Sequence, residues 1–233
     1  MPEDKGGNFR ECEKLWLVFG DIHDRLENFD RIPELERADG IIISGDLSNC
    51  GGREDAERIM KKLRSAKIPV LAQIGNMDKA EIDDWLSSEG ENIHGSVREL
   101  APGVAVFGVG GSTFTPMHTC SEFPEEAYAA WLAEEWQTAK NYPHALLVSH
   151  TPPMDTACDA INEILHAGSA AVREFIEREQ PELCVCGHIH EGRGADRIGD
   201  TLILNPGTLA DGGYVVVCLR DGRLTASLAN VNE

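Results

Sequence analysis

Five short apolar runs in this chain each end in polar residues of the kinds that bind metal ions. The first run, residues 15–19, has the composition of a buried β-strand and is followed by Asp21 and His23. Side chains two residues apart in an extended chain point the same way, so these two are predicted to face one point. Open α/β sheets place their ligands at the carboxyl ends of strands. The pair therefore predicts half of a metal site, although a turn with a surface histidine gives the same short motif.

The next two runs end in an oxygen ligand. Residues 41–44 precede Asp46, and residues 70–74 precede Asn76. Each residue alone could be a turn former, and Asp46 could also cap a helix. A third strand end with an oxygen ligand makes the turn interpretation less attractive.

Histidines follow the last two runs. Residues 145–148 lead into His150, and residues 183–186 lead into His188 and His190. A lone histidine is usually a satisfied surface or core residue. Three histidines at two strand ends, beside the earlier strand-end ligands, are not well explained that way and favour a shared metal centre.

Helical patterns separate these strands. The clearest helix covers residues 53–66, which carry one apolar stripe, and a short helix is predicted for residues 79–88. Residues 25–38 read as an interrupted helix that Pro33 breaks or kinks. Pro124 and the acids after it indicate another helix start.

Composition narrows the classes of partner. The 40 acidic residues outnumber the 21 basic ones and give a net charge of -19, which disfavours a nucleic-acid duplex. No apolar run approaches the ~18 residues of a membrane helix, so no membrane partner is expected. At 233 residues one domain is the default prediction, with residues 15–233 forming it after a disordered, non-secretory lead-in at residues 1–14.

The seven cysteines include no C-x-x-C pair. Cys184 and Cys186 lie in an apolar run, where both would face the same side as small hydrophobic residues. This usage fits a reducing compartment and argues against a disulfide framework, so a cytoplasmic location is predicted.

Taken in order, the five polar groups resemble the signature blocks of the calcineurin-like metallophosphoesterase superfamily. The blocks are Asp21-x-His23, Gly45-Asp46, Gly75-Asn76-x-Asp78, Ser149-His150 and Gly187-His188-x-His190. Residues 45–51, 110–112 and 205–207 are similar to the small single-domain prokaryotic members of a phosphodiesterase-type branch. The resemblance covers Leu15 to Leu228 and implies an α/β fold, a four-layer αββα sandwich of two mixed β-sheets flanked by helices.

The resemblance also implies a role for each residue. One divalent ion would be held by Asp21, His23, Asp46 and His190, and the other by Asp46, Asn76, His150 and His188. Two ions about 3.5–4 Å apart, bridged by Asp46, can share a water that becomes a hydroxide and attacks phosphorus in line. Nitrogen and oxygen ligands without thiolate suit Mn, Fe, Ni or Zn, of which Mn is favoured. Asp78 would orient the ligands, or would instead cap the helix that begins near Lys79.

One position departs from the family pattern. Many members have a histidine after the asparagine, where it acts at the leaving oxygen, whereas Met77 of this chain cannot donate a proton. A branch with cysteine there still hydrolyses phosphodiesters. His118 is a candidate replacement and His94 a weaker one, although an ordinary surface histidine is the better interpretation of either. Asp46, Asn76, Asp78 and His118 are the predicted catalytic residues.

The sequence therefore predicts a dinuclear metal-dependent phosphohydrolase that favours phosphodiesters over monoesters. The partner would be a small phosphorylated substrate, and homo-oligomer formation stays open. Residues 113–123 and 154–167 are predicted to form the substrate rim, because loops over a rigid scaffold usually set specificity. The alternative function is a metal-binding protein-interaction scaffold of the same fold with little or no catalysis. A DNA-repair nuclease is opposed by the acidic balance.

Overall fold

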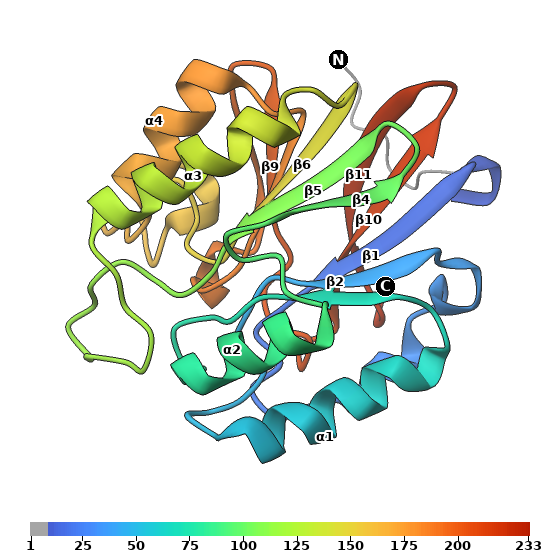
Figure 1. The fold of residues 1–233 in the computed structure, drawn as a ribbon, viewed down its shortest axis with the longest axis horizontal. Coiled ribbons are helices and arrows are strands. Elements are labelled where there is room, and N and C mark those ends of the chain that lie inside the picture. Colours follow the sequence, from blue (N-terminus) through green and yellow to red (C-terminus); the bar gives the residue numbers. More distant parts are fainter. Residues whose placement is uncertain (1–8) are drawn as a thin grey trace.

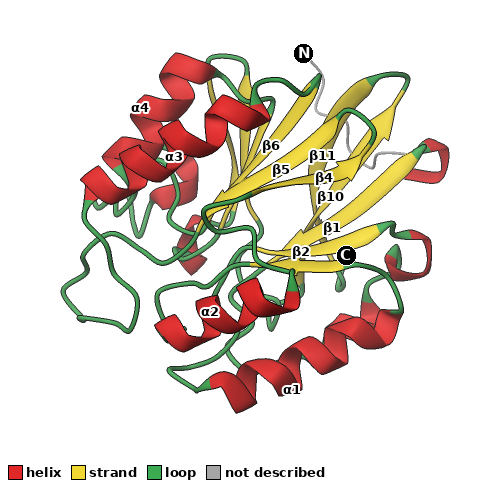
Figure 2. Ribbon diagram, in the orientation of Figure 1, coloured by secondary structure: helices red, strands yellow, loops and turns green. Residues whose placement is uncertain are grey.

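Two mixed β-sheets pack face to face between two pairs of helices. The structure is a computed structural model that describes residues 9–233. The five-stranded sheet has the order β11-β10-β1-β2-β3, and the six-stranded sheet has the order β4-β5-β6-β7-β9-β8. Helices α1 and α2 cover one outer face and α3 and α4 cover the other (Figures 1 and 2). The predicted four-layer sandwich is confirmed.

The strands and helices have the following bounds. The strands are β1 (Lys14–Phe19), β2 (Gly40–Ile43), β3 (Val70–Ala72), β4 (Val97–Ala101), β5 (Val104–Val109), β6 (His144–Ser149), β7 (Leu183–Cys186), β8 (Gly194–Ile198), β9 (Thr201–Asn205), β10 (Gly213–Arg220) and β11 (Arg223–Asn230). The helices are α1 (Arg53–Leu63), α2 (Ala80–Glu89), α3 (Glu125–Ala139) and α4 (Ala170–Glu179). Short 3₁₀ turns are η1 (Phe9–Glu11), η2 (Phe29–Arg31), η3 (Leu35–Arg37), η4 (Arg64–Ala66), η5 (Ala157–Asp159) and η6 (His190–Gly192). None of the helices within residues 9–233 is both long and apolar enough to cross a bilayer.

The core has three layers because the central strands are buried on both faces. On β1, Leu15 and Leu17 pack with the α1 and α2 side, whereas Trp16 and Val18 pack between the two sheets. Cys184 and Cys186 of β7 belong to the layer beneath α3 and α4, as the sequence predicted. Strands covered on both faces read as nearly continuous apolar runs, which is why these runs stand out in the sequence.

Parallel pairing brings the carboxyl ends of the strands to one edge. Strands β1, β2 and β3 run parallel in one sheet, and β5, β6, β7 and β9 run parallel in the other. The loops that leave these strands therefore meet at the same edge of the sandwich. Gln73, which is fully buried, links the sheets there by donating from Nε2 to the carbonyl oxygens of Ser44, Val109 and Val148 at 3.1–3.3 Å.

Two predictions about the amino-terminal third are wrong. Residues 25–38 form no α-helix but two 3₁₀ turns, η2 and η3, because Pro33 separates them and leaves neither segment long enough for an α-helix. The lead-in does not extend to residue 14, since η1 begins at Phe9 and β1 at Lys14. The rest of the predicted lead-in, residues 1–8, lies outside the described residues.

A disulfide joins Cys12 and Cys218, which corrects the expectation drawn from cysteine usage. Their Cα atoms lie 5.5 Å apart although 206 positions separate them in the sequence. The antiparallel pairing of β1 with β10, in which Lys14 faces Leu219, brings them together. Nothing in the spacing of seven cysteines indicates this pair, because the contact depends on sheet order.

We expect Cys12→Ser to lower the free energy of unfolding by about 2–4 kcal/mol under oxidising conditions, because the cross-link restricts the unfolded chain. Urea unfolding with and without a reductant measures this. Cys50→Ser, which changes an exposed free thiol, is the matched control and should shift stability by no more than about 0.5 kcal/mol. Equal stability of the parent and Cys12→Ser in oxidising buffer would contradict the prediction.

Candidate metal centre

The seven predicted ligands converge at the edge where the strands end. They lie on the loops that follow β1, β2, β3, β6 and β7. The residues are Asp21, His23, Asp46, Asn76, His150, His188 and His190. All seven are joined by a continuous series of polar contacts of 2.8–3.9 Å. The structure therefore brings together every ligand position that the sequence predicted.

Asp46 occupies the middle of this group. Its Oδ2 lies 3.6 Å from Nε2 of His23 on one side and 3.4 Å from Nε2 of His150 on the other. Its Oδ1 accepts a hydrogen bond from the backbone N–H of Met77 at 2.8 Å. A carboxylate between two groups of ligands is placed to bridge two ions.

The first group surrounds Asp21. Oδ1 of Asp21 lies 3.3 Å from Nε2 of His190 and 3.9 Å from Nε2 of His23. The Nε2 atoms of His23 and His190 face each other at 3.2 Å. These three residues offer atoms close enough together to hold one cation.

The second group surrounds Asn76. Its Oδ1 lies 2.8 Å from Nδ1 of His188 and 3.1 Å from Nε2 of His150. Asn76 and His150 are both buried, with exposed fractions of 2% and 0%. Together with Asp46 they give an oxygen and nitrogen ligand set without thiolate, which suits divalent transition metals.

The spacing of these atoms fits a bound metal better than a hydrogen-bond network. Ligand atoms about 2.1 Å from an ion and at right angles to each other stand about 3 Å apart. Two facing imidazole nitrogens can share at most one proton, and the buried Nδ1 atom of half-buried His23 has no hydrogen-bond partner among the described residues. Nitrogen and oxygen atoms that converge at this spacing fit divalent cations.

The backbone at the centre has a conformation that residues other than glycine rarely adopt. Asp21, His23, Asp46 and His188 have φ angles of 47°, 46°, 52° and 67°. Left-handed conformations cost energy in residues other than glycine and cluster at functional sites. Asp21 and His23 thus meet on a left-handed turn, which corrects the extended geometry predicted for them.

Charges within the centre are strongly coupled. Burial pushes the pKa of Asp46 upward, but the charge of His150 and its hydrogen bond outweigh burial and hold that pKa below its usual value. Burial would likewise lower the pKa of His150, yet the Asp46 carboxylate raises it to about 9. Burial and the charge of His150 lower the pKa of His188 to about 4. Protons on these groups occupy positions that metal ions would take, so metal and proton binding compete.

Asp78 fastens two of the ligand loops together. One carboxylate oxygen accepts from the backbone N–H groups of Leu47 and Gly75 at 2.9 and 3.0 Å, and the other accepts from that of Ser48 at 2.9 Å. Burial and the charge of Asp46 raise the pKa of Asp78 to about 7. The N-cap of α2 is Lys79, so the alternative that Asp78 caps this helix is wrong. Its position behind Asp46 and Asn76 supports an orienting role.

The orientation of the Asn76 amide is set by two residues that sequence reasoning missed. Nδ2 of Asn76 donates to Oγ1 of Thr119 at 2.9 Å, and that hydroxyl donates to Oε1 of Glu122 at 2.6 Å. Burial pushes the pKa of Glu122 up, but hydrogen bonds from Thr115 and Thr119 lower it to about 2, so this carboxylate is a fixed acceptor. Oδ1 of Asn76 therefore points toward the histidines. No motif marks Thr119, because its role depends on how the 113–123 loop folds over the centre.

The two candidate replacements for the missing histidine have different surroundings. His118 is exposed on the 113–123 loop, one residue before Thr119, and its backbone N–H donates to the carbonyl of Thr115 at 3.3 Å. Nδ1 of His94 accepts a hydrogen bond from the backbone N–H of Gly110, and its ring packs against Trp131 with centroids 4.6 Å apart. His94 is thus engaged in packing rather than aimed at the centre, whereas half-buried Met77 lies beside Asp46.

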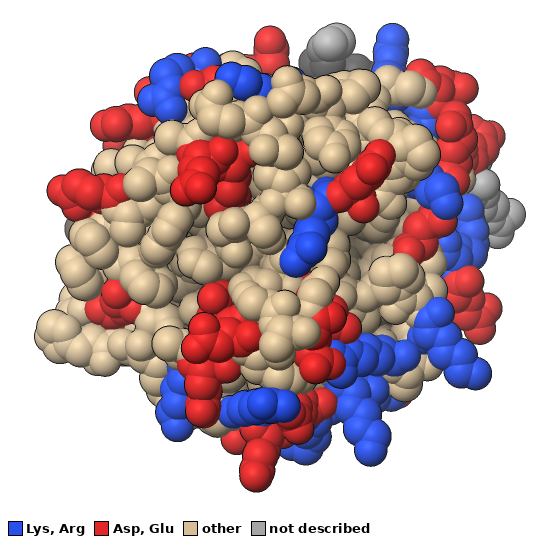
Figure 3. Space-filling view, viewed as in Figure 1, with Lys and Arg blue, Asp and Glu red and all other residues tan. Residues whose placement is uncertain are grey.

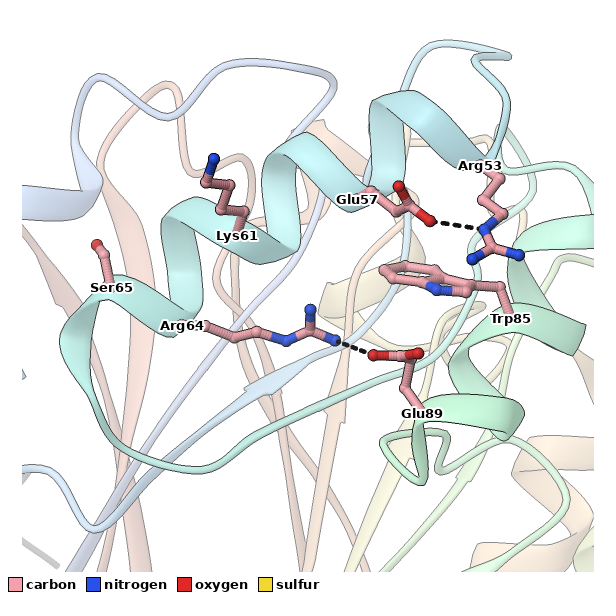
Figure 4. A pocket seen from close by; sticks show the side chains of 7 residues that line it. All are labelled: Arg53, Glu57, Lys61, Arg64, Ser65, Trp85 and Glu89. Carbon is pink, nitrogen blue, oxygen red and sulfur yellow. Dashed lines mark hydrogen bonds and ion pairs between the residues drawn. The ribbon is translucent and has the colours of Figure 1, made fainter.

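A surface hollow of about 420 Å³ between α1 and α2 contains none of the candidate ligands (Figure 4). Arg53 and Arg64 lie over the ring of Trp85 at 5.9 and 5.6 Å. Both are paired with acids, Arg53 with Glu57 and Arg64 with Glu89. Arg58 and Lys62 of α1 are also paired with acids, so most basic residues of this helix are neutralised by neighbouring carboxylates, as expected for a solvated helix face.

A comparison with protein families shows which family this chain belongs to. A family model described as "Metallophosphoesterase, calcineurin superfamily" matches residues 17–227. The chain belongs to this superfamily. Membership and the Asp/His cluster together indicate a hydrolase that binds divalent metal.

Individual relatives extend the comparison. An uncharacterized protein of Methanocaldococcus jannaschii, MJ1162, is 36% identical over 174 residues, covering 72% of this chain and 77% of its own. The glycerophosphodiester phosphodiesterase GpdQ of Enterobacter lignolyticus is 24% identical over 186 residues, covering 74% of this chain and 65% of its own. The crystal structure of a dimetal phosphatase from Danio rerio has the same fold, with a TM-score of 0.67 at 14% identity over 94% of this chain and 97% of the other.

We expect Thr119→Val to weaken metal binding about 10- to 100-fold, because the Asn76 amide loses the acceptor that orients it. Calorimetric titration with Mn²⁺ measures the change. Thr115→Val is the matched control, since Thr115 binds Glu122 but not Asn76. If both variants lost the same affinity, general loosening of the loop would explain the result and the orienting role of Thr119 would be rejected.

Proposed function

We propose that this protein is a dinuclear, metal-dependent phosphodiesterase. The observation that carries the proposal is the position of Asp46 between two ligand groups, with His23 on one side and His150 on the other. When bound, two divalent ions would stabilise charge on the phosphoryl oxygens and lower the pKa of a coordinated water. Manganese is the ion we favour, on ligand chemistry alone.

The chain's own residues would position these ions and the substrate. Asp21 accepts from the backbone N–H of His188 at 3.2 Å, so the two groups of ligands are tied together directly. Asn205 donates from Nδ2 to the carbonyl of Ile189 at 2.8 Å, which holds the turn between His188 and His190. The centre is therefore preorganised, and little rearrangement is needed when ions and a phosphoryl group bind.

The preference for diesters over monoesters is supported by the distant similarity to GpdQ, which is described as a glycerophosphodiester phosphodiesterase. Met77 concerns the leaving group instead, because it leaves the leaving oxygen without a side-chain acid at that position. A small phosphorylated substrate in the cytoplasm remains our proposal. The Cys12–Cys218 disulfide removes the cysteine argument for that location.

The test uses metal-stripped protein titrated with Mn²⁺ and assayed on an aryl phosphodiester and an aryl phosphomonoester. We expect two ions per chain and faster cleavage of the diester. Binding of two ions without turnover of either ester would reject the enzyme and favour the alternative, a protein-interaction scaffold. Manganese-dependent cutting of linear DNA at physiological salt would overturn the small-substrate proposal.

We expect Met77→His to raise turnover of diesters with alkyl leaving groups more than that of diesters with aryl leaving groups. A histidine there could protonate the leaving oxygen, and only a poor leaving group needs that proton; general-acid catalysis contributes about 10²–10⁴-fold when well placed. The ratio of the two kcat values measures the effect. Met77→Gln, which has a side chain of similar length without an acidic group, is the control. An equal gain on both substrates would contradict the assignment of this position.

A further inference from the structure

The exposed large apolar side chains of this protein are concentrated beside the metal centre. Within residues 9–233 they are Phe114, Met117, Ile164 and Leu165, with exposed fractions of 70%, 75%, 92% and 50%. The first two lie on the loop of residues 113–123 and the last two on the loop of residues 154–167. Scattered single apolar residues on a surface need no explanation, but four on two neighbouring loops do.

The 113–123 loop is attached to the centre itself. Thr119 accepts from Nδ2 of Asn76 at 2.9 Å, and the backbone N–H of Ser121 donates to the carbonyl of Asn76 at 3.0 Å. The loop projects outward at the left of Figure 1, between β5 and α3. Residues 110–121 include no Asp, Glu, Lys or Arg in a chain of net charge -19, although Glu122 follows in the same loop. The lower left of Figure 3 is mostly tan, with one acidic group in it.

The 154–167 loop is attached to the turn that carries His188 and His190. Asn205 donates from Nδ2 both to the carbonyl of Cys158 at 3.0 Å and to that of Ile189 at 2.8 Å. At the tip, Oδ1 of Asn162 accepts from the backbone N–H groups of Ile164 and Leu165 at 3.1 Å. The apolar side chains are thus presented on a formed turn.

Both loops end on a common anchor. The Glu125 carboxylate, two residues after the first loop, accepts from Ser169 Oγ at 2.6 Å and from the backbone N–H groups of Ala170 and Ala171 at 3.0 Å. Ser169 follows the second loop by two residues. The carboxyl-terminal ends of the two loops therefore lie close together, at the amino ends of α3 and α4.

We propose that the substrate is an amphiphilic phosphodiester whose long alkyl or acyl chain lies on Phe114, Met117, Ile164 and Leu165 while its phosphorus sits at the metal centre. This inference rests on the proposed function. It accounts for exposed apolar residues on two loops that hydrogen bonds of Thr119 and Asn205 tie to the centre. Burial of an alkyl chain on these side chains would supply binding energy through the hydrophobic effect.

A membrane surface is a poorer occupant. Proteins that dock on anionic membranes usually surround their apolar residues with Lys and Arg, and residues 110–121 have none. Net charge -19 would also repel such a surface. A dissolved amphiphile meets neither obstacle.

The test compares two phosphodiesters with one aryl leaving group, the second substituent being methyl in one and dodecyl in the other, below the micelle concentration and with Mn²⁺ present. We expect kcat/KM to be at least about tenfold higher for the dodecyl ester, mainly because KM is lower. Burial of a few methylene groups supplies enough binding free energy for this difference. Phe114→Ser and Ile164→Ser should each reduce this ratio several-fold. Phe114→Leu, which keeps an apolar side chain, and Lys61→Ser on α1 should retain it.

Equal kcat/KM for the two esters would overturn the amphiphile and leave the phosphodiesterase standing. If neither ester is cleaved, calorimetry with dodecyl phosphate and methyl phosphate gives a separate answer. Tighter binding of dodecyl phosphate that Phe114→Ser abolishes would support the apolar rim although the catalytic proposal had failed. A change of the sedimentation coefficient in Phe114→Ser without a change of the ratio would show that the patch covers a second copy, and would overturn the proposal.

Discussion

Asp46→Asn is expected to lower turnover of the proposed phosphodiester substrate by more than about 100-fold, and to reduce metal binding from the proposed two ions per chain to at most one. Loss of a residue that only orients a metal ligand typically lowers metal affinity or activity by about 10- to 100-fold. Loss of the proposed bridging ligand itself should therefore lower both by more. Asparagine keeps the shape and the contact with Met77 N–H but removes the negative charge between His23 and His150. Steady-state kinetics and metal analysis after gel filtration measure the two effects.

The matched control makes the same substitution at the opposite end of the sheets. Asp39 accepts from Lys14 Nζ at 2.6 Å and from the backbone N–H of Leu15 at 2.9 Å, at the amino end of β1. Asp39→Asn should keep both ions and nearly all activity. Two bound ions in Asp46→Asn, or equal activity of the two variants, would show that Asp46 does not bridge.

The convergence of the candidate ligands could be predicted from the sequence because it follows from the sheet topology. Each ligand follows an apolar run, and parallel strands buried on both faces deliver their carboxyl ends to one edge. The geometry assumed for Asp21 and His23 was nevertheless wrong, since both have positive φ angles and lie on a turn. The prediction that the candidate ligands converge was still correct, because convergence depends on where the strands end and not on the alternation of side chains within the loop.

The supporting residues could not be predicted in the same way. Thr119, Glu122 and Gln73 have roles only because distant segments fold against each other, and a threonine or glutamine in a sequence carries no sign of its partner. The disulfide is a similar case, because Cys12 and Cys218 meet through the pairing of β1 with β10. The helix predicted for residues 25–38 was wrong for a local reason. An apolar periodicity interrupted by Pro33 is compatible with 3₁₀ turns as well as with an α-helix.

One buried carboxylate has no place in the metal centre. Glu135 of α3 is 5% exposed, and neither of its oxygens forms a hydrogen bond of good geometry with the described residues. Burial raises the pKa of Glu135 to about 9, and the backbone of Gly108 and Gly95 offsets this only in part. The helical pattern did not predict the burial of Glu135, because a glutamate on an amphipathic helix ordinarily lies on the solvated face.

Glu135 should make the protein less stable as pH rises. Between pH 4.5 and 9 the unfolded state releases this proton and the folded state keeps it, so the free energy of unfolding falls by about 1.4 kcal/mol per pH unit. The contribution is complete below pH 4.5 and is lost as pH rises toward 9. Glu135→Gln removes the titration, so its free energy of unfolding relative to the parent should increase by roughly 5 kcal/mol from pH 5 to pH 9.

Urea unfolding of the metal-free protein at several pH values measures this difference directly, since titrations shared by the two proteins cancel. Glu134→Gln is the matched control, because Glu134 precedes Glu135 on α3 and is exposed. Its stability relative to the parent should stay constant within about 0.5 kcal/mol over the same range. A constant difference for Glu135→Gln as well would mean that Glu135 is ionised in the folded protein. Such a charge would need a counter-ion or water that pairs with it inside the α3 layer, because an unpaired buried carboxylate is too costly to persist.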